Sequence, residues 1–184
     1  LVGGAMAYTF LAAEDEHVGE SLVEEQRIDD AKDILQRARR KGVELLLPTD
    51  HVIATDMDAD PSEVTTTKSV TIPDGKMGLD IGPQTIDAYR QAILDAQTIF
   101  WNGPMGVFER EPFAEGTFSM ARALAETDAK TVVGGGDSGA AIHQAGVADR
   151  ITHISTGGGA SLQMVEGKPL PGIEALRANH PFDI

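Results

Sequence analysis

The sequence contains no cysteine, and this absence excludes two kinds of structure. Without thiols the chain can form neither disulfide bonds nor metal sites built on thiolate ligands. A chain free of cysteine fits a reducing compartment, so we expect a cytoplasmic location.

Long apolar runs are also missing, although 41% of the residues are hydrophobic. A helix needs about 20 consecutive apolar residues to cross a bilayer, and no stretch approaches that length. We therefore expect no membrane role. The 184 residues suffice for one sizeable core, and neither internal repeats nor a linker divides them, so residues 1–184 are predicted to form a single domain.

Positive charge is scarce. Lysine and arginine together number 15, against 29 aspartate and glutamate residues, which gives a net charge of −14. Such a charge repels a phosphate backbone, so nucleic acid is not expected as a partner. Any site for a phosphorylated ligand must be made locally, by groups that do not depend on the overall charge.

Glycine, in contrast, is concentrated at particular places. Residues 130–141 read KTVVGGGDSGAA and residues 151–162 read ITHISTGGGASL, so a β-branched run twice ends in three glycines and continues as a helix-compatible segment. This order predicts a strand, a tight turn and a helix start. Glycine lets backbone N–H groups approach a ligand closely, and a helix start leaves about four of them unpaired. Each junction is a candidate anion site, although the glycines could equally serve only close packing of strand on helix.

The same order of strand, glycine and helix recurs elsewhere. Residues 1–12 form a third junction, and apolar spacing from Ile28 onward, closed by Gly42, predicts a surface helix packed on a sheet. Strands alternating with helices predict an α/β fold, a three-layer Rossmann-like domain with a mostly parallel sheet and helices on both faces. Ligands bind such sheets beyond the carboxyl ends of the strands. The other predicted segments are strands within 43–47, 64–72 and 98–101, a glycine-containing turn at 77–83, a helix at 84–95 and a helix opened by Pro112.

The first residues begin where a strand would be ending. A strand usually has about five residues, and only Leu1 and Val2 precede Gly3. We therefore expect the sequence to be part of a longer polypeptide.

Residues 134–139 also satisfy the pattern G-x-G-x-x-G, which makes an NAD-binding oxidoreductase domain the simplest rival interpretation. That class needs an acidic residue about 20 positions further on, at the end of the next strand. Here that strand ends in Ser155, Thr156 and Gly157, none of which is acidic, so NAD binding ranks second. A Walker-type NTPase fits less well, because no glycine loop is followed by lysine and serine or threonine.

Five motifs together carry a resemblance to a known family. They are GGAMAYTF, MGLDIGP, WNGPMGVFE, GGGDSGAA and HISTGGGAS. In this order and at these intervals they resemble the C-terminal, nucleotide-binding half of phosphoglycerate kinase, over essentially the whole chain. The resemblance implies an ATP/ADP-binding domain with Mg²⁺ as cofactor. It also implies the glycolytic reaction, in which a phosphoryl group passes reversibly between 1,3-bisphosphoglycerate and ADP.

The resemblance further implies that 3-phosphoglycerate or 1,3-bisphosphoglycerate binds to an N-terminal domain upstream of Leu1. Two lysines on the nucleotide side would also lie upstream, and none of this is in the sequence. We therefore expect the chain to bind nucleotide with little or no turnover of its own, and to be a monomer. The resemblance ends near Leu176, and residues 177–184 extend past it.

For the base and ribose of the nucleotide, the resemblance implies contacts from three of these motifs. It places the adenine in a slot lined by Gly3, Gly4, Gly78 and Leu79. It assigns support of the ribose and phosphates to Asn102, Gly103 and Pro104, and hydrogen bonding to the ribose hydroxyls to Glu109.

The phosphate side of the site is implied in the same way. The resemblance assigns phosphate oxygens to Gly135, Gly136 and Ser138, Mg²⁺ to Asp137, and the phosphoryl group in transfer to the N–H groups of Gly157, Gly158 and Gly159. His153 and Thr156 would lie near the hinge between the two domains.

The residues themselves leave simpler roles open. Asp137 could be only a helix N-cap, which is a common role for aspartate, and Glu109 could be a solvated surface acid. A noncatalytic nucleotide-binding or interaction module also remains open as a function for this chain.

Overall fold

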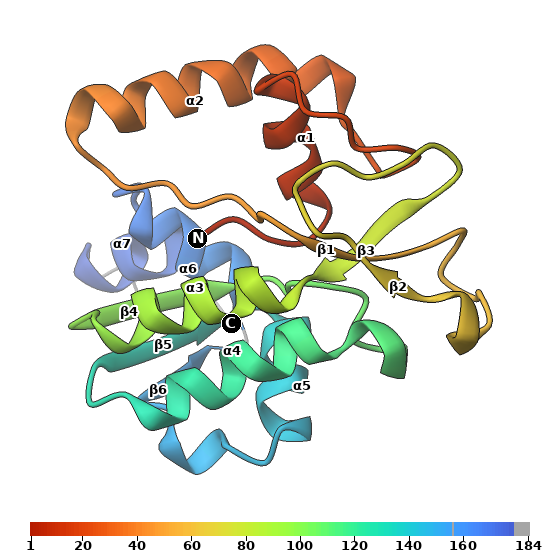
Figure 1. Cartoon of the computed structure of the whole chain (residues 1–184). Helices are drawn as coiled ribbons and strands as arrows, with labels where there is room; N and C mark the ends of the chain where they lie inside the picture. Colours follow the sequence, from red (N-terminus) through yellow and green to blue (C-terminus); the bar gives the residue numbers. More distant parts are fainter. Residues whose placement is uncertain (156, 179–184) are drawn as a thin grey trace.

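The structure is a computed structural model and describes residues 1–155 and 157–178 (Figure 1). Its centre is a parallel sheet of three strands in the order β4-β5-β6, which helices flank. The predicted α/β class with a parallel sheet is therefore confirmed. The strands are β4 (Thr98–Asn102), β5 (Lys130–Gly134) and β6 (His153–Ser155).

The register of this sheet aligns the three carboxyl ends. Asn102 lies opposite Gly134, and Gly134 lies opposite Ser155. Glycine loops then lead from β5 into α5 (Gly136–Gln144) and from β6 into α6 (Gly158–Val165), as the sequence predicted. Because parallel strands end at the same edge, both helix starts lie at one edge of the sheet.

A second sheet of three antiparallel strands was not predicted. Its order is β2-β1-β3, with β2 (Thr65–Thr66), β1 (His51–Ala54) and β3 (Met77–Ile81). The prediction of a turn at 77–83 is wrong, because Leu79 to Ile81 are buried and the strand pairs with β1, Asp80 opposite Val52 and Ile81 opposite His51. Only Gly82 connects this strand to the next helix.

Two other strand predictions need correction. The segment 43–47 forms no strand, because Val43 and Glu44 are exposed and the carbonyl of Leu46 accepts the N–H of Val2 and the side-chain hydroxyl of Tyr89 instead of a row of strand partners. In the segment 64–72 only the two residues of β2 pair as a strand, and a separate bridge joins Ile72 to Val18.

The N-terminal helices form a layer of their own at the top of Figure 1. They are α1 (Ala5–Ala13) and α2 (Ile28–Lys41), and Gly42 ends α2 in the left-handed region at φ 64°. The prediction that this helix packs on a sheet is wrong. Its buried residues Ala31 and Leu35 pack instead against Phe10 and Ala13 of α1.

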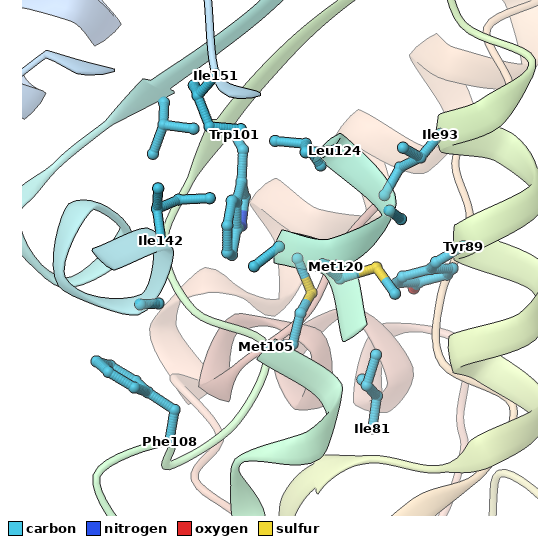
Figure 2. Packing of buried hydrophobic residues seen from close by; sticks show 14 of the residues in the cluster. Ile81, Tyr89, Ile93, Trp101, Met105, Phe108, Met120, Leu124, Ile142 and Ile151 are labelled. Atoms are coloured by element: carbon cyan, nitrogen blue, oxygen red, sulfur yellow. The ribbon is translucent and has the colours of Figure 1, made fainter. Parts of the chain in front are cut away.

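The main core lies between the parallel sheet and the helices α3 (Pro83–Leu94), α4 (Glu115–Glu126) and α5 (Figure 2). Trp101 and Val133 from the strands meet Met120 and Leu124 from α4. A 3₁₀ turn at Glu111–Phe113 precedes α4, so this helix starts later than Pro112. The remaining elements are the 3₁₀ turns η1 (Glu25–Arg27), η2 (Pro61–Glu63) and η4 (Ala148–Arg150), and the helix α7 (Pro171–Arg177).

Within the described residues, none of the helices is both long enough and apolar enough to cross a membrane. The predicted tail beyond residue 178 and the predicted hinge residue Thr156 lie outside the described residues.

Candidate functional site

One pocket of the described chain has a volume of about 730 Å³. It lies between the start of α1, the strand β3 and the segment 100–107. Pockets of this size accommodate small organic ligands, and those are typically lined by apolar side chains with a few polar groups. Its lining includes Gly3, Gly4, Tyr8, Gly78, Leu79, Asn102, Gly103, Pro104, Met105, Gly106 and Val107.

Segment 103–107 connects the two sides of this pocket through backbone hydrogen bonds. The carbonyl of Met105 accepts from the N–H of Gly4 at 2.9 Å, and the N–H of Val107 donates to the carbonyl of Leu79 at 2.9 Å. Gly4 is the N-cap of α1 and has φ 63°, a conformation that glycine adopts at little cost. The wall of the pocket is thus made of backbone from three separate motifs.

Seven residues that the sequence assigned to the nucleotide line this one pocket. They are Gly3, Gly4, Gly78, Leu79, Asn102, Gly103 and Pro104. A side chain at Gly78 would overlap the hydroxyl of Tyr8, so only glycine leaves room there. Residues separated by as many as about 100 positions are therefore brought to one site by the fold.

The glycine loops after β5 and β6 lie beside this pocket. Asn102 lines the pocket and is close to both loops. A Cβ atom at Gly134 would lie 3.2 Å from the side-chain nitrogen of Asn102, and one at Gly158 would lie 3.7 Å from the same atom. A Cβ at Gly158 would also lie 2.8 Å from the Cα of Gly135, so the two loops meet. The N-cap of α5 is Gly135, at φ 94°.

Ser138 holds the β5 loop against the pocket segment. Its buried hydroxyl accepts the N–H of Gly103 at 2.7 Å. On the other side of Gly103, the indole Nε1–H of Trp101 donates to its carbonyl at 2.7 Å. The hydroxyl of Ser138 therefore has a structural role as an acceptor, its own O–H remains a donor, and its phosphate contact stays a prediction.

Asp137 is exposed in the first turn of α5. The simpler role as an N-cap is wrong, because Gly135 is the N-cap and Asp137 lies in the first turn of the helix. Among the described residues, no group of three or more His, Cys, Asp or Glu side chains could hold a metal ion by itself. Mg²⁺ commonly binds through one carboxylate together with phosphate oxygens and water, so a single accessible carboxylate fits this ion.

Other predicted residues lie outside the pocket lining. Glu109 is exposed and does not line it, and the same holds for Gly136, Gly157 and Gly159. His153 is exposed on β6. The ribose role of Glu109 and the transfer role of the glycines at 157–159 stay predictions.

The apolar rim of the pocket was missed by the sequence analysis. Met6, Leu22 and Met57 line the pocket and are 60%, 67% and 52% exposed. Met77 and Leu162 also line it. Large exposed apolar side chains around a concave site are a signal of ligand contact, but only the structure shows that these residues share one rim.

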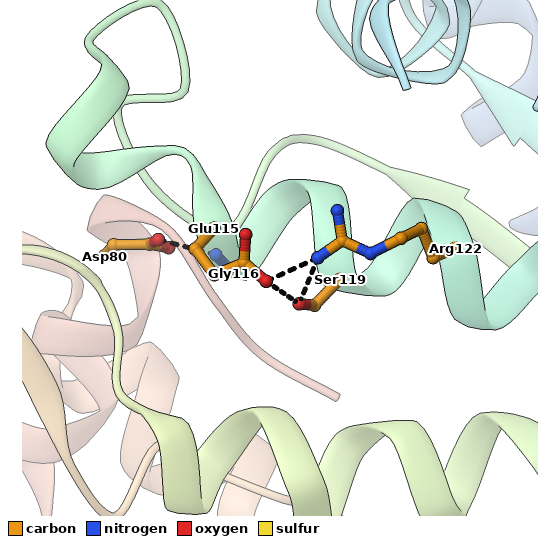
Figure 3. A network of polar contacts seen from close by, with 5 residues as sticks. All are labelled: Asp80, Glu115, Gly116, Ser119 and Arg122. Atoms are coloured by element: carbon orange, nitrogen blue, oxygen red, sulfur yellow. Dashed lines mark hydrogen bonds and ion pairs between the residues drawn. The ribbon is translucent and has the colours of Figure 1, made fainter. Parts of the chain in front are cut away.

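Two buried titratable residues belong to the pocket wall: Tyr8, which lines the pocket, and Asp80, which does not. Burial raises the pKa of Asp80 to about 7, and Glu115 adds to the shift, although the N–H groups of Gly116 and Ile81 hydrogen-bond to the carboxylate and oppose it (Figure 3). Burial also raises the pKa of Tyr8, with a smaller contribution from the charge of Asp80. The wall is therefore a poor environment for negative charge.

His51 lies next to Tyr8, with 5.5 Å between the ring centroids. Burial lowers its pKa to about 4, although the charge of Asp50 and the backbone of Val70 partly oppose the shift. Within the described residues, neither ring nitrogen makes a hydrogen bond of normal geometry. The neutral ring is therefore the form that the fold accommodates.

These features define a class of protein. It is an α/β protein with an apolar pocket beside two glycine loops at the carboxyl edge of a parallel sheet. Such a site suits a ligand with a flat apolar part and an anionic part, because helix starts attract anions while the apolar lining of the pocket favours an apolar group.

Comparison with known proteins identifies the family. The family model of phosphoglycerate kinase matches residues 1–168. A phosphoglycerate kinase of Anaeromyxobacter sp. (strain Fw109-5) is 57% identical over 95% of this chain, and one of Clostridium novyi (strain NT) is 55% identical over 96%. The chain belongs to the phosphoglycerate kinase family. It covers 44% of the length of both relatives, so it spans less than half of each.

Solved structures agree with this assignment. Phosphoglycerate kinase from Coxiella burnetii matches 95% of this chain with a TM-score of 0.88 and 40% identity, and the match covers 45% of that protein. The enzyme from Pyrococcus horikoshii OT3 matches 95% with a TM-score of 0.81 and 34% identity, covering 44% of it.

Proposed function

We propose that this chain is the nucleotide-binding part of a phosphoglycerate kinase and that it binds ADP and ATP together with Mg²⁺. One observation carries the proposal: seven residues assigned to the nucleotide from the sequence line a single pocket that lies beside the glycine loops of β5 and β6. The whole protein would transfer a phosphoryl group between 1,3-bisphosphoglycerate and ADP.

In this proposal the pocket and the loops divide the nucleotide between them. The base lies in the apolar slot beside Gly4 and Gly78, two residues that have no side chain of their own. The phosphates extend toward the start of α5, whose unpaired N–H groups and partial positive charge favour anions. Trp101 and Ser138 hold Gly103 from two sides and so orient the segment between base and phosphates.

Mg²⁺ would be held by Asp137 and by phosphate oxygens, and when bound it would neutralise part of their charge. The exposed carboxylate of Asp137 in the first turn of α5 supports this role. The N–H groups of residues 157–159 would donate hydrogen bonds to the oxygens of the transferred phosphoryl group.

Turnover needs more than this chain supplies. Phosphoryl transfer depends on positioning and on neutralising charge at the transferred group, and none of the described residues that line the pocket is a lysine or an arginine. A helix start contributes only about half a positive charge. The second substrate, 3-phosphoglycerate as phosphoryl acceptor or 1,3-bisphosphoglycerate as phosphoryl donor, would bind to the remainder of the longer protein. We therefore propose that this chain alone binds nucleotide and turns over little.

The alternative of an NAD-binding oxidoreductase domain has less support. The last described residue of β6 is Ser155, whose hydroxyl accepts the N–H of Gly157 at 3.3 Å and the hydroxyl of Ser161 at 2.8 Å. No carboxylate occupies this position for a ribose hydroxyl, as that class requires. The cytoplasmic location and the monomeric state remain predictions.

Calorimetric titration of the 184-residue chain with MgADP, MgATP and NAD⁺ tests the proposal. We expect MgADP to bind more tightly than NAD⁺, and tighter binding of NAD⁺ would contradict it. A coupled assay with 3-phosphoglycerate and MgATP should stay at background. Turnover of roughly 1–100 per second, as for ordinary kinases, would show that the site is complete without further residues.

A further inference from the structure

A buried threonine on α4 holds the segment that forms the pocket wall. The hydroxyl oxygen of Thr117 accepts the N–H of Met105 at 3.0 Å and the N–H of Gly106 at 3.3 Å. Thr117 itself is 0% exposed and does not line the pocket. Two consecutive backbone donors of the wall therefore depend on one side chain that is out of reach of the ligand.

The contact continues from the wall to the glycine junction of α1. Met105 donates its N–H to the hydroxyl oxygen of Thr117, and its carbonyl accepts the N–H of Gly4. The next residues are joined to β3, through the hydrogen bond between Val107 and Leu79. Thr117 thus lies at the start of a connected path that ends at the two sides of the base slot.

Asp80 fixes the helix start from which Thr117 projects. Its buried carboxylate accepts the N–H of Gly116 at 2.7 Å, and it fills the space beside Gly106 and Gly116, where a Cβ atom at either glycine would overlap it (Figure 3). On the outer surface of α4, Glu115 accepts from Ser119 and Arg122. The position of the Thr117 hydroxyl is therefore set by groups on both sides of the helix start.

We propose that Thr117 is a positioning residue for the nucleotide site, acting through the backbone of Met105 and Gly106. This inference rests on the proposed nucleotide-binding function. Without the hydroxyl, two backbone N–H groups in the interior of the wall would lack an acceptor, which is unfavourable enough to move the segment toward another partner. A shift of segment 103–107 would change the width of the base slot and the place of Gly4.

The chain provides a matched control in Thr85 of α3. Thr85 is 1% exposed. It is the third residue after the N-cap of α3, as Thr117 is the third residue after the N-cap of α4. Its hydroxyl accepts the N–H of Thr49 at 2.9 Å and that of Asp50 at 3.2 Å. The loop that it holds does not line the pocket. A change at Thr85 therefore removes a similar set of hydrogen bonds without touching the wall.

The experiment compares Thr117→Val, Thr117→Ser and Thr85→Val in the 184-residue chain. MgADP affinity is measured by calorimetry, thermal stability by circular dichroism, and the state of the wall by the fluorescence of Trp101, the single tryptophan. We expect Thr117→Val to weaken MgADP binding about tenfold and to shift the Trp101 emission, because two buried donors lose their partner. Thr117→Ser should stay within about twofold of the parent, since it keeps the acceptor. Thr85→Val should lower the melting temperature while keeping the MgADP affinity and the emission of the parent.

The outcomes separate this inference from the proposed function. If the parent chain binds no MgADP, the proposed function fails and the inference falls with it. If the parent binds but Thr117→Val binds equally well, or if Thr85→Val weakens binding as much, only the positioning role is overturned. Should Thr117→Val not fold, Thr117→Ala makes the same comparison without added bulk, and parental affinity in that variant would also overturn the role.

Discussion

The starts of α3 and α4 each combine a buried threonine in the first turn with a buried aspartate from another element. They differ in how many hydrogen bonds the aspartate accepts. At α3, Asp50 accepts the N–H of Gln84 at 2.9 Å, the N–H of Thr85 at 2.8 Å and the hydroxyl of Thr85 at 2.7 Å. At α4, Asp80 accepts only one bond from the helix, the N–H of Gly116, and one from Ile81 in its own strand.

The hydroxyls differ in the same way. Thr85 donates to Asp50 and accepts from the loop beside it, so carboxylate and threonine form one closed cap. Thr117 accepts from Met105 and Gly106 of the pocket wall instead, and Asp80 is left with two donors and a raised pKa. The complete cap at α3 therefore stabilises the fold. At α4 the cap is incomplete, and the threonine hydroxyl instead holds the wall of the candidate site.

Removing the complete cap should have the largest effect. In Asp50→Ala, two N–H groups and a hydroxyl at the start of α3 lose their acceptor, and each unsatisfied buried group costs about 1–3 kcal/mol. We expect a loss of about 4–5 kcal/mol in the free energy of unfolding, measured by urea denaturation. The control Asp74→Ala, at an exposed aspartate that pairs with His17, should change it by less than about 0.5 kcal/mol. A loss at Asp50 no larger than this would contradict the capping role.

The incomplete cap predicts a pH effect at Asp80. Its folded pKa of about 7 lies above the ordinary value of 3.8, so the folded state binds the proton more tightly and stability falls as pH rises between these values. A shift of this size corresponds to about 4 kcal/mol. We expect the stability difference between the parent and Asp80→Asn to change by about this amount between pH 4 and pH 7.5 in urea denaturation. A difference that is constant across this range would show that Asp80 ionises normally in the folded chain.

His51, on the other side of Tyr8, should act with the opposite sign. Its folded pKa of about 4 lies below 6.5, so the unfolded state binds the proton more tightly and stability falls as pH decreases from 6.5 to 4. The shift corresponds to about 3 kcal/mol. Replacing His51 by Phe removes the titration while keeping an aromatic ring beside Tyr8, so the variant should resist acid better than the parent. Equal acid sensitivity of parent and variant, measured by urea denaturation from pH 4 to 7, would exclude this effect.

The smallest expected effect concerns a third helix start, that of α5, where the aspartate makes no cap. Because Asp137 is exposed there, Asp137→Asn should leave stability nearly unchanged. We expect it to weaken MgADP binding about tenfold, which is roughly 1.4 kcal/mol, and to change metal-free ADP binding much less, since a hard cation prefers carboxylate oxygen. Calorimetry with and without Mg²⁺ measures both. Equal losses in the two titrations would mean that Asp137 does not hold the metal.

Sequence analysis succeeded where the local pattern carries the information. The strands β4 and β5 and the helices that follow the glycines were predicted, because β-branched runs, glycine turns and helix-compatible segments follow one another directly. It failed at β3 (Met77–Ile81), because the glycines within 77–83 suggested a turn. Gly78 serves instead to leave room for Tyr8, a residue 70 positions away.

The candidate site shows the same division. The motifs named Gly3, Gly78 and Asn102 as parts of one site, and the structure places all three around one pocket. The motifs gave no sign of the rim formed by Met6, Leu22 and Met57, because exposed apolar residues become meaningful only when they gather around one opening.

The sequence by itself determined where strands meet helices, since backbone conformation at glycines such as Gly4 and Gly135 is a local property. It also excluded thiol chemistry and a broad cationic surface through its composition. Only the tertiary structure decided what those junctions face and which buried groups support them. Thr117 reaches the wall of the pocket and Thr85 does not, because long-range packing, rather than residue type, determines which backbone N–H groups lie within reach of a hydroxyl.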